Sequence, residues 1–496
     1  MSKSIQVVLL WIGFTLQHAG AQEYAARLID SETTLPIPYA SIVYGESLGV
    51  ITNDEGYFQF GTDTPSSIKD SITISCMGYQ KKTLAFNTLK DSIILLQPGG
   101  FELEGVALFG KGLTAEEIVS RMLDSIPVNY PTLPVRKKFF LRQSTVNEID
   151  ALDIALKSST IKAITGGIID SLLAELPKKT EYHTETYGEL FKAGNKIKLT
   201  VEKATEMYDK ERQATYTGLN HALKKILREH TKEDSYFKIK SGPISTKMDM
   251  DSIIGNPAIL DDPNDSISSS IKRNYLTSRI NRVTAIEQQV FGTKSRLDLL
   301  SKHKNYAFTK EESIEKEEER YYVLSFTPKK KGKLRGKIYI NAIDFALVRL
   351  EYENLVPIKG LKLLGIDYKE PQYQGVAMFS KMNNGQYELQ FSSLKHHFFV
   401  DVRRPFKIAE KNKSTKGRRK QNEITLDLYL TAKSSNVFEW VALESKPSSQ
   451  STFNSVPQSK LVEVVYRTQY DSGYWDGNTI FSPSAAIKSY TVFNDD

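Results

Sequence analysis

The sequence predicts a mainly β protein with flanking helices, in which a small β-sandwich precedes a larger α+β domain. Between Tyr321 and Glu353, apolar residues recur at every second position, for example Val348, Leu350 and Tyr352. This alternation is typical of strands with one buried face, and short polar connections favour an antiparallel, curved sheet. A chain of 496 residues is also too long for one ordinary core.

Composition places the chain among globular proteins, because 40% of its residues are hydrophobic and 25% are charged. The net charge of +7 is small for this length, so it permits an anionic partner without requiring one. The single cysteine, Cys76, cannot form an intramolecular disulfide. It lies in a strand-like run, and we expect a buried structural thiol.

The N-terminus has the pattern of a secretory signal peptide. Lys3 precedes an apolar run from Ile5 to Leu16, and Ala19-Gly20-Ala21 forms an Ala-x-Ala site before Gln22. We therefore expect residues 1–21 to be removed; the alternative is an uncleaved anchor. The residue directly after the site is Gln22 and not a cysteine, so no lipoprotein anchor is expected. The predicted location is the periplasm or the outer membrane, as an associated protein.

Residues 23–98 show short, evenly spaced strand patterns that predict a β-sandwich. A tight turn is expected at Thr52–Gly56, where Gly56 can adopt a positive φ at low cost. The carboxylates of this turn could also suggest a calcium loop, but no bidentate Glu follows at the required spacing. The predicted strands are Tyr24–Ile29, Tyr39–Tyr44, Tyr57–Phe60, Ser71–Cys76 and Ser92–Leu96.

Three motifs of this region resemble the carboxypeptidase-D regulatory-like domain: Pro38–Ile42, Gly49 with Thr52–Phe58, and Ser75–Tyr79. The resemblance covers residues 23–98 and implies a transthyretin-like β-sandwich. Such modules are common in envelope proteins of Bacteroidota-type bacteria, and they carry no catalytic residues. The resemblance therefore predicts a fold and an envelope context rather than a reaction.

Residues 99–113 read as a linker, and residues 114–496 as an α+β domain of unknown function. Thr114 and Glu117 form a capping box that opens a helix, which Pro127 is expected to end. Helical patterns are read in Ala151–Leu176 and Thr205–His230. Asp249–Asp265 is rich in Asp, Pro and Asn, and predicts a loop.

The antiparallel sheet is predicted to begin at about residue 321. Its later strands are Val376–Lys381, Gln386–Val402 and Glu423–Lys433, with a hairpin turn at Asn383–Gly385. The hairpin formed by residues 336–349 is similar to one in LolA-like periplasmic lipoprotein carriers. That resemblance covers one hairpin, and such hairpins recur in unrelated sheets.

No catalytic motif emerges from the sequence. His230 and Glu233 form a His-x-x-Glu pair that could bind zinc with His303, His396 or His397, but the surroundings of a carboxypeptidase site are missing. His396 and His397 are expected on opposite faces of a strand. No nucleophile elbow, P-loop or Rossmann fingerprint occurs. We therefore predict no catalytic residue, no metal, no cofactor and no nucleic-acid partner.

The predicted function is that of a non-enzymatic exported envelope protein that binds a hydrophobic ligand, a lipid or a protein partner. A curved sheet crossed by helices leaves a concave apolar face suited to such ligands. Two alternatives remain at this point. One is an envelope assembly or surface-interaction module, and the other is a hydrolase with an unrecognised site.

Basic residues supply the candidate surface contacts. If strands from Tyr321 run alternately up and down, loops 329–335, 355–375 and 403–422 share one end of the sheet. Together they would attract anionic headgroups, at about 1 kcal/mol per Lys or Arg near a membrane. A turn near 392–396, instead of a bulge, would move the third loop to the other end. The candidates are Lys329, Lys330, Lys331, Lys333, Arg335, Arg403, Arg404, Lys407, Arg418, Arg419 and Lys420.

Overall fold

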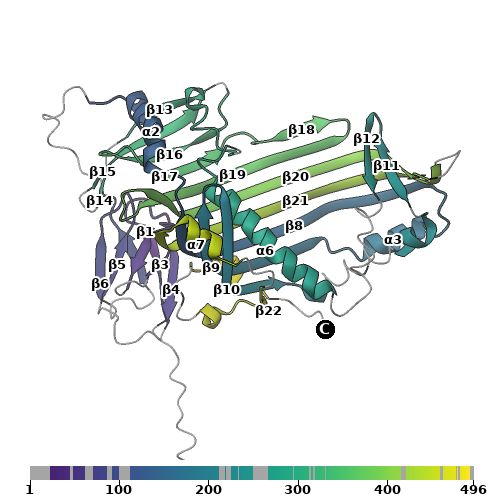
Figure 1. Cartoon of the computed structure of the whole chain (residues 1–496), viewed down its shortest axis with the longest axis horizontal. Helices are drawn as coiled ribbons and strands as arrows, with labels where there is room; N and C mark the ends of the chain where they lie inside the picture. The colour runs from purple at the N-terminus through teal and green to yellow at the C-terminus, as the bar shows by residue number, and fades with distance from the viewer. Residues whose placement is uncertain are drawn as a thin grey trace, which may run out of the picture. The chain divides into compact units, whose positions relative to one another are not determined.

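The computed structural model of the chain is shown in Figure 1 and divides into two compact units. The first unit contains residues 1–100 and 471–489, and the second contains residues 101–470 and 490–496. The residues described by the structure are 23–44, 49–61, 71–85, 92–99, 112–211, 218, 225–232, 234–249, 266–293, 295–311, 314–316, 319–329, 331–414, 420–457, 462–475, 478 and 481–491. The predicted signal peptide, most of the linker and the 250–265 loop lie outside these residues.

The first unit consists of two sheets around one apolar core. One sheet has the order β4-β1-β7 and the other the order β3-β2-β5-β6. Leu28, Ile42, Phe58 and Ile74 are fully or almost fully buried in the core, and Cys76 is buried beside them. The strands are β1 (Glu23–Asp30), β2 (Ser41–Val43), β3 (Gly49–Ile51), β4 (Tyr57–Gly61), β5 (Ser71–Ser75), β6 (Lys82–Ala85) and β7 (Ser92–Leu96).

A segment from the far end of the sequence completes this unit. Residues 471–489 carry the short helices η4 (Ser472–Trp475) and α8 (Ala485–Lys488). Phe481 is buried and forms a parallel bridge with Ile51. The sequence-based boundaries placed this segment with the second domain. The reason for the difference is a long-range pairing that local patterns do not reveal.

The second unit is organised around a sheet of 15 strands among the described residues. Its main path is β13-β15-β16-β17-β19-β20-β21-β8-β9-β10-β22, and all its pairs are antiparallel except β10 with β22. The strands are β8 (Val135–Ser159), β9 (Lys179–Ala193), β10 (Lys196–Tyr208), β11 (Ser235–Ser241), β12 (Ile244–Asp249), β13 (Tyr306–Lys310), β14 (Ile314–Lys316), β15 (Glu319–Pro328), β16 (Leu334–Asn341), β17 (Leu347–Asn354), β18 (Gly360–Leu363), β19 (Ile366–Lys381), β20 (Tyr387–Asn412), β21 (Lys420–Pro447) and β22 (Val465–Arg467).

The sheet therefore begins at Val135, and the prediction of a start near residue 321 is wrong. Residues 151–159 belong to β8 and residues 205–208 to β10, where helical patterns were expected. Three of the strands are exceptionally long: β8 has 25 residues, β20 has 26 and β21 has 28. They run side by side in Figure 1. Over the half of each strand that lies away from the main core, residues on both faces are mostly half-buried or exposed. Such half-exposed strands lack the sharp apolar alternation that identifies a strand in sequence.

The helices α2 (Ala115–Asn129) and α6 (Ser266–Glu287) pack on one face of this sheet. On β9, Phe191 and Ala193 point to the other face, where they contact Phe453 of α7 (Gln450–Ser455). The unit also contains α3 (Gly166–Ala174) and the short turn η3 (His303–Asn305). The predicted capping box is confirmed, since the Thr114 side chain accepts from the Glu117 amide and Glu117 bonds the Thr114 amide. Pro127 lies inside α2 rather than at its end. Among the described helices, none is long and apolar enough to cross a membrane.

The main core lies between the sheet and the helices α2 and α6. Ile118 and Met122 of α2, Val283 and Ile286 of α6, and Trp440 of β21 are buried within it. Figure 1 shows α6 running obliquely over the long strands. The same face of the sheet continues well beyond this helix, and it contains the candidate site.

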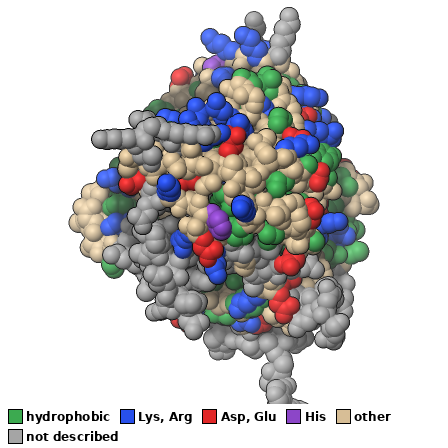
Figure 2. All heavy atoms as spheres, turned by 90° about the vertical axis from the view of Figure 1, so that its right-hand side faces the viewer, with side chains coloured by type: hydrophobic (Ala, Val, Ile, Leu, Met, Phe, Trp, Pro, Cys, Tyr) green, Lys and Arg blue, Asp and Glu red, His purple; other side chains and the backbone are tan. Residues whose placement is uncertain are grey.

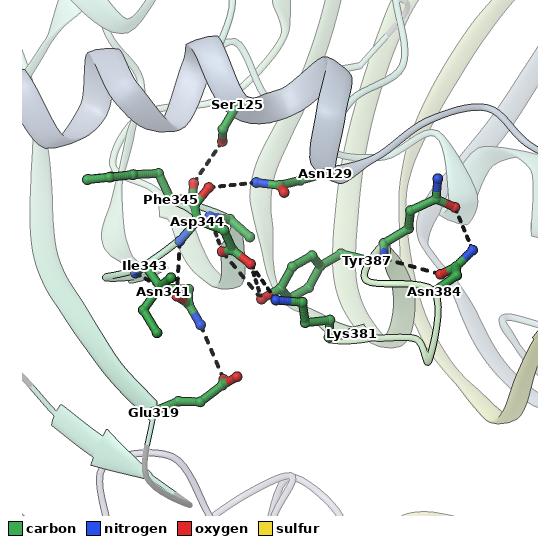
Figure 3. A network of polar contacts seen from close by, with 12 residues as sticks. Ser125, Asn129, Glu319, Asn341, Ile343, Asp344, Phe345, Lys381, Asn384 and Tyr387 are labelled. Atoms are coloured by element: carbon green, nitrogen blue, oxygen red, sulfur yellow. Dashed lines mark hydrogen bonds and ion pairs between the residues drawn. The ribbon is translucent and has the colours of Figure 1, made fainter.

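The hairpin of β16 and β17 is fixed to α2 by a polar network, shown in Figure 3. Ser125 and Asn129 of α2 donate hydrogen bonds to the carbonyls of Phe345 and Asp344, at 2.9 Å each. The Asp344 carboxylate accepts from Lys381 at 2.7 Å and from the Tyr387 hydroxyl at 3.1 Å. This network holds the hairpin against the helix side of the sheet and closes one end of the core.

Candidate ligand-binding face

The helix-bearing face of the sheet remains apolar beyond α6. In β21, even-numbered residues point to this face, because Trp440 and Phe438 lie under the helix and the register toward β20 is unbroken from Val441 to Glu423. The register shifts toward β8 over residues 424–442 insert the extra residue in β8, so the alternation along β21 is kept. Leu426 is paired with Leu156, Leu428 with Ile154, and Leu430 with both Leu152 and Val402. We call this surface the distal apolar face; it comprises the half-buried residues Leu152, Ile154, Leu156, Phe398, Val400, Val402, Leu426, Leu428 and Leu430.

The opposite face of the same strands is polar. Thr431 donates to the Asp401 carboxylate at 2.9 Å, and Lys407 forms an ion pair with Glu423 at 2.9 Å. Arg403 pairs with Asp401 at 3.2 Å, and its guanidinium lies 4.6 Å from the centre of the Tyr429 ring. The outer part of the sheet is therefore amphipathic, with a hydrated face and an aliphatic one.

A polar band separates the distal apolar face from α6. Thr145 donates to Asn436 at 2.9 Å, Asn436 donates to Ser434 at 3.2 Å, and Ser434 donates to Asn147 at 2.7 Å. These residues occupy neighbouring positions on β8 and β21, on the same face as the aliphatic rows. A ligand lying along the strands would meet aliphatic side chains first and polar ones close to the helix.

One buried carboxylate, Glu370 of β19, gathers several side chains next to this band. Its Oε1 accepts from the Tyr368 hydroxyl at 2.7 Å, and its Oε2 lies 3.0 Å from His396 Nε2 and pairs with Arg296. Burial raises the pKa of Glu370, but Tyr368, Arg296 and His396 outweigh it and hold that pKa below its usual value. Burial lowers the pKa of His396, although Glu370 opposes this effect. Glu370 is therefore ionised beside a neutral His396 at pH 7.

Arg282 of α6 contacts the sheet at the edge of the helix. Its guanidinium lies 3.6 Å from the centre of the Phe438 ring, which is a cation–π contact. Burial, followed by repulsion from Arg279, lowers the pKa of Arg282 to about 10. Arg279 is buried, donates to Thr184 at 2.6 Å, and leaves its Nε without a hydrogen-bond partner. Within the described part of the chain, neither arginine forms an ion pair with a carboxylate.

Hollows formed by described residues also lie elsewhere on this unit, and two of them can be compared with this face. A pocket of about 140 Å³ is lined by Tyr130, Phe379, Lys192 and Glu287 among others, but its charged groups already neutralise one another. A shallower hollow of about 530 Å³ is lined largely by residues of the polar face, such as Lys369, Phe399 and Lys433. Neither combines an extended apolar lining with a charged side chain that lacks an ion pair among the described residues, whereas the face beside α6 does.

The structure disperses the predicted cationic residues instead of joining them in one rim. Lys330, Arg418 and Arg419 lie outside the described residues. Arg335 pairs with Glu353 at 2.7 Å, Lys420 pairs with Glu423 at 3.0 Å, and Lys333 donates to the Ile358 carbonyl at 2.6 Å. Lys329 and Lys331 lie in the connection between β15 and β16. Their contact with an anionic surface stays a prediction.

Residues 403–412 form part of β20, where a loop was expected. Arg404 is 5% exposed and donates to the Ser241 carbonyl, while its Nε and Nη1 have no partner. Its guanidinium is therefore unavailable to a membrane surface. This correction follows from the length of β20, which continues without a turn through 392–396.

Unequal strand lengths also separate the two basic segments. The first basic segment, 329–335, ends level with His396 of β20. Leu334 pairs with Asn354, the Asn354 side chain accepts a hydrogen bond from the Tyr373 amide, and Tyr373 pairs with His396. Asn412, the last residue of β20, lies about 50 Å further along that strand. Figure 2 shows the side of the molecule that lies at the right of Figure 1, where Lys and Arg side chains lie in several groups among acidic ones. The assumption that strands alternate in direction assigns loops to an end of the sheet, but it does not give strand lengths and could not reveal this separation.

No group of three or more His, Cys, Asp or Glu side chains suited to a metal occurs in the described ranges. His230 Nδ1 lies 2.9 Å from the Ile226 carbonyl, and Glu233 is outside these ranges. His396 and His397 contact different groups, Glu370 and Ser435 respectively, as expected for neighbours on one strand.

Sequence reasoning missed Arg282, Glu370 and the β8 half of the distal apolar face. The one available signal was the alternation of Ile424, Leu426, Leu428 and Leu430 within the predicted strand Glu423–Lys433, and the pairing with β20 places these residues on one face. Its partners Leu152, Ile154 and Leu156 were assigned to a helical pattern. Without the β8–β21 pairing, the face could not be assembled.

No protein-family model matches the chain, and none of the curated proteins matches it. Solved structures similar to it include a LolA superfamily protein from Nitrosomonas europaea (8% identity, TM-score 0.17, covering 71% of this chain and 99% of that one). A second is a DUF1329 family protein from Desulfovibrio piger (8% identity, TM-score 0.18, covering 67% of this chain and 93% of that one). A third is the MucA/MucB complex of Pseudomonas aeruginosa (7% identity, TM-score 0.17, covering 68% of this chain and 99% of that one). Scores this low do not establish a shared fold, so these similarities assign no function to the chain.

Proposed function

We propose that this protein is a non-enzymatic binding protein of the cell envelope that holds the acyl chain of a lipid on the distal apolar face. The observation that supports this most directly is the continuation of the aliphatic rows beyond α6. Leu426, Leu428 and Leu430 are half-buried there. On the opposite face of the same strands, polar side chains bind one another through ion pairs and hydrogen bonds. Such an amphipathic sheet is suited to a ligand on one side only.

The dimensions of this face favour an acyl chain. From Leu426 to the level of Phe398, the aliphatic rows extend for about 25 Å along the strands. One leaflet of a bilayer provides about 15 Å of hydrocarbon, so a lipid chain fits within this length. The rows consist mainly of leucine, isoleucine and valine, which lack the polar atoms that would fix a peptide or a sugar.

Two features of the sequence support an envelope location for this activity. The predicted signal peptide supports export, and the resemblance of residues 23–98 to the carboxypeptidase-D regulatory-like domain supports a place in the envelope, in the periplasm or at the outer membrane. We propose that this first unit is a transthyretin-like module that serves docking. Lipid capture then belongs to the second unit and needs no catalytic residue.

Mass spectrometry of protein purified from its native envelope tests the proposal. Protein carrying co-purified acyl chains is the expected result. Binding of a fluorescent fatty acid to the purified chain then gives the affinity. A stable protein partner without any bound lipid would favour the assembly-module alternative instead.

A pair of adjacent substitutions locates the binding face. Leu426→Glu places a carboxylate among Leu156 and Phe406, so fatty-acid binding should be lost. Thr425→Glu introduces the same group on the polar face, opposite Lys407, and should preserve binding. Equal affinities of the two variants would exclude the distal apolar face as the site.

Peripheral contact with an anionic membrane is a secondary proposal. The β18–β19 hairpin supports it, because Leu361, Leu363 and Leu364 are each about half exposed and Lys362 lies between them. Replacing Lys329 and Lys331 by glutamine, or separately Lys359 and Lys362, should weaken binding to anionic vesicles and reduce its salt dependence. Unchanged binding in both double variants would exclude this contact.

A further inference from the structure

We propose that Arg282 binds the anionic headgroup of the lipid whose acyl chain lies on the distal apolar face. The inference rests on the proposed function and narrows its ligand to a lipid with a phosphate or carboxylate head. It is carried by the position of Arg282, by the absence of an ion pair to Arg282 among the described residues, and by the polar band between Arg282 and the aliphatic rows.

The position of Arg282 suits a headgroup. Its guanidinium stacks on Phe438, and Phe438 lies on the same face and the same strand as Leu430, Leu428 and Leu426. Phe398, at the level of Ser434, is the first apolar residue beyond the polar band. It lies about 13 Å along the strand from the level of Phe438, a span that a headgroup and its linkage can cross.

The charge balance around Arg282 leaves room for an anion. Arg279, Arg282 and Arg296 lie on this side of the sheet, and the only carboxylate that pairs with any of them in the described residues is Glu370, the partner of Arg296. Buried or half-buried guanidinium groups are normally paired, and an unpaired one is unfavourable. Burial and Arg279 both lower the pKa of Arg282, which is the expected sign of a cation without a counter-ion.

The polar band supplies uncharged donors and acceptors for the linkage region. Asn436 and Thr145 lie level with His396, between Phe438 and the aliphatic rows. Guanidinium groups bind phosphate and carboxylate through two parallel N–H bonds, which gives direction as well as affinity. A lipid would therefore lie with its head toward α6 and its chain toward the outer end of β21.

Two single-chain amphiphiles of equal chain length, an alkyl phosphate and an alkyl glycoside, provide the test by titration calorimetry. The full-length wild-type protein should bind the phosphate roughly tenfold or more tightly than the glycoside. In Arg282→Gln this preference should fall to near unity, with glycoside affinity retained. Arg282→Lys should keep part of the preference, because the charge remains without the planar fork.

The control is Arg403→Gln, which removes an arginine from the polar face and should leave both affinities unchanged. A thermal unfolding curve for each variant excludes loss of fold. Equal wild-type affinity for the two amphiphiles would overturn the headgroup assignment and leave acyl binding intact. Retention of the phosphate preference in Arg282→Gln would also overturn the headgroup assignment. So would loss of that preference only in Arg404→Gln, because Arg404 lies on the same face of the sheet, opposite Leu428. Binding of neither amphiphile would refute the proposed function itself.

Discussion

Asn53 donates a hydrogen bond from its side chain to the carbonyl of Pro483, 430 positions away in the sequence, at 3.0 Å. The same side chain accepts from the amides of Glu55 at 3.0 Å and Tyr57 at 2.9 Å. Asn53 is buried, so all three bonds form away from water. One residue thus shapes the turn into β4 and fastens residues 471–489 to the first unit.

Replacing Asn53 by alanine should destabilise the first unit by about 1–3 kcal/mol, because buried backbone groups lose their partners. Faster hydrogen exchange at the amides of residues 55 and 57 is the measurement. Asn53→Asp keeps the acceptor oxygen but removes the donor to Pro483. If Asn53→Asp unfolds like the wild type, the bond to Pro483 contributes nothing to stability.

Phe58 provides a test of the core of the same unit. Its side chain is almost fully buried and stacks against Phe60, with ring centres 6.1 Å apart. Phe58→Ala should cost about 3–5 kcal/mol, because it removes buried contacts and leaves a cavity. Tyr57→Ala changes the neighbouring, exposed aromatic residue and should cost less than about 1 kcal/mol. Similar costs in denaturant unfolding would show that Phe58 is not a core residue.

The sequence predicts elements that carry their own local chemistry. The Thr52–Gly56 turn and the Thr114 cap are confirmed, because an Asn side chain, a glycine at φ 78° and a capping box act within a few residues. The strands of the first unit alternate clearly, since one face of each is buried in a small core. These features require no knowledge of distant partners.

Longer-range features could not be predicted. Residues 151–156 contain apolar side chains at both helical and strand spacings, and only pairing with β21 decides between them. Phe481 and Pro483 join the first unit through contacts with Ile51 and Asn53, which no local pattern encodes. The same holds for Arg282, whose significance lies in the absence of an ion pair with any carboxylate that the structure describes.

A buried network of four charges should dominate the stability of the second unit near α6. Lys137 contacts Glu287 at 2.8 Å and Glu388 at 2.9 Å, and Lys192 contacts the same two carboxylates. Burial raises the pKa of Glu287, but the two lysines outweigh it and hold that pKa below its usual value. Lys137→Met should therefore cost about 3–5 kcal/mol, because it leaves two carboxylates with one cation.

A compensating substitution separates charge balance from packing in this network. Lys137→Met combined with Glu287→Gln restores neutrality, so the double variant should be more stable than Lys137→Met alone. Unfolding in urea, followed by the fluorescence of buried Trp440, measures both. A double variant less stable than both single variants would contradict the electrostatic explanation.

Three buried or half-buried histidines predict a loss of stability below neutral pH. Burial lowers the pKa of His183, His396 and His397. The positive charge of Lys395 lowers the pKa of His397 further. The unfolded chain takes up protons near the ordinary histidine pKa of 6.5, before the folded protein does. Because the unfolded state then binds more protons, the free energy of unfolding decreases as pH falls from about 6.5 toward the folded pKa values.

His397→Gln isolates one contribution to this pH dependence. The glutamine amide can replace the contact between His397 Nε2 and the Ser435 hydroxyl, which is 2.6 Å long, but it does not titrate. The loss of stability between pH 7 and pH 5 should therefore be smaller in the variant than in the wild type. Glu370 contributes only at lower pH, because its lowered pKa lies below the carboxyl value of 4.5. Identical slopes for the two proteins would show that His397 has the same pKa in the folded and unfolded states, and that its burial has no effect on titration.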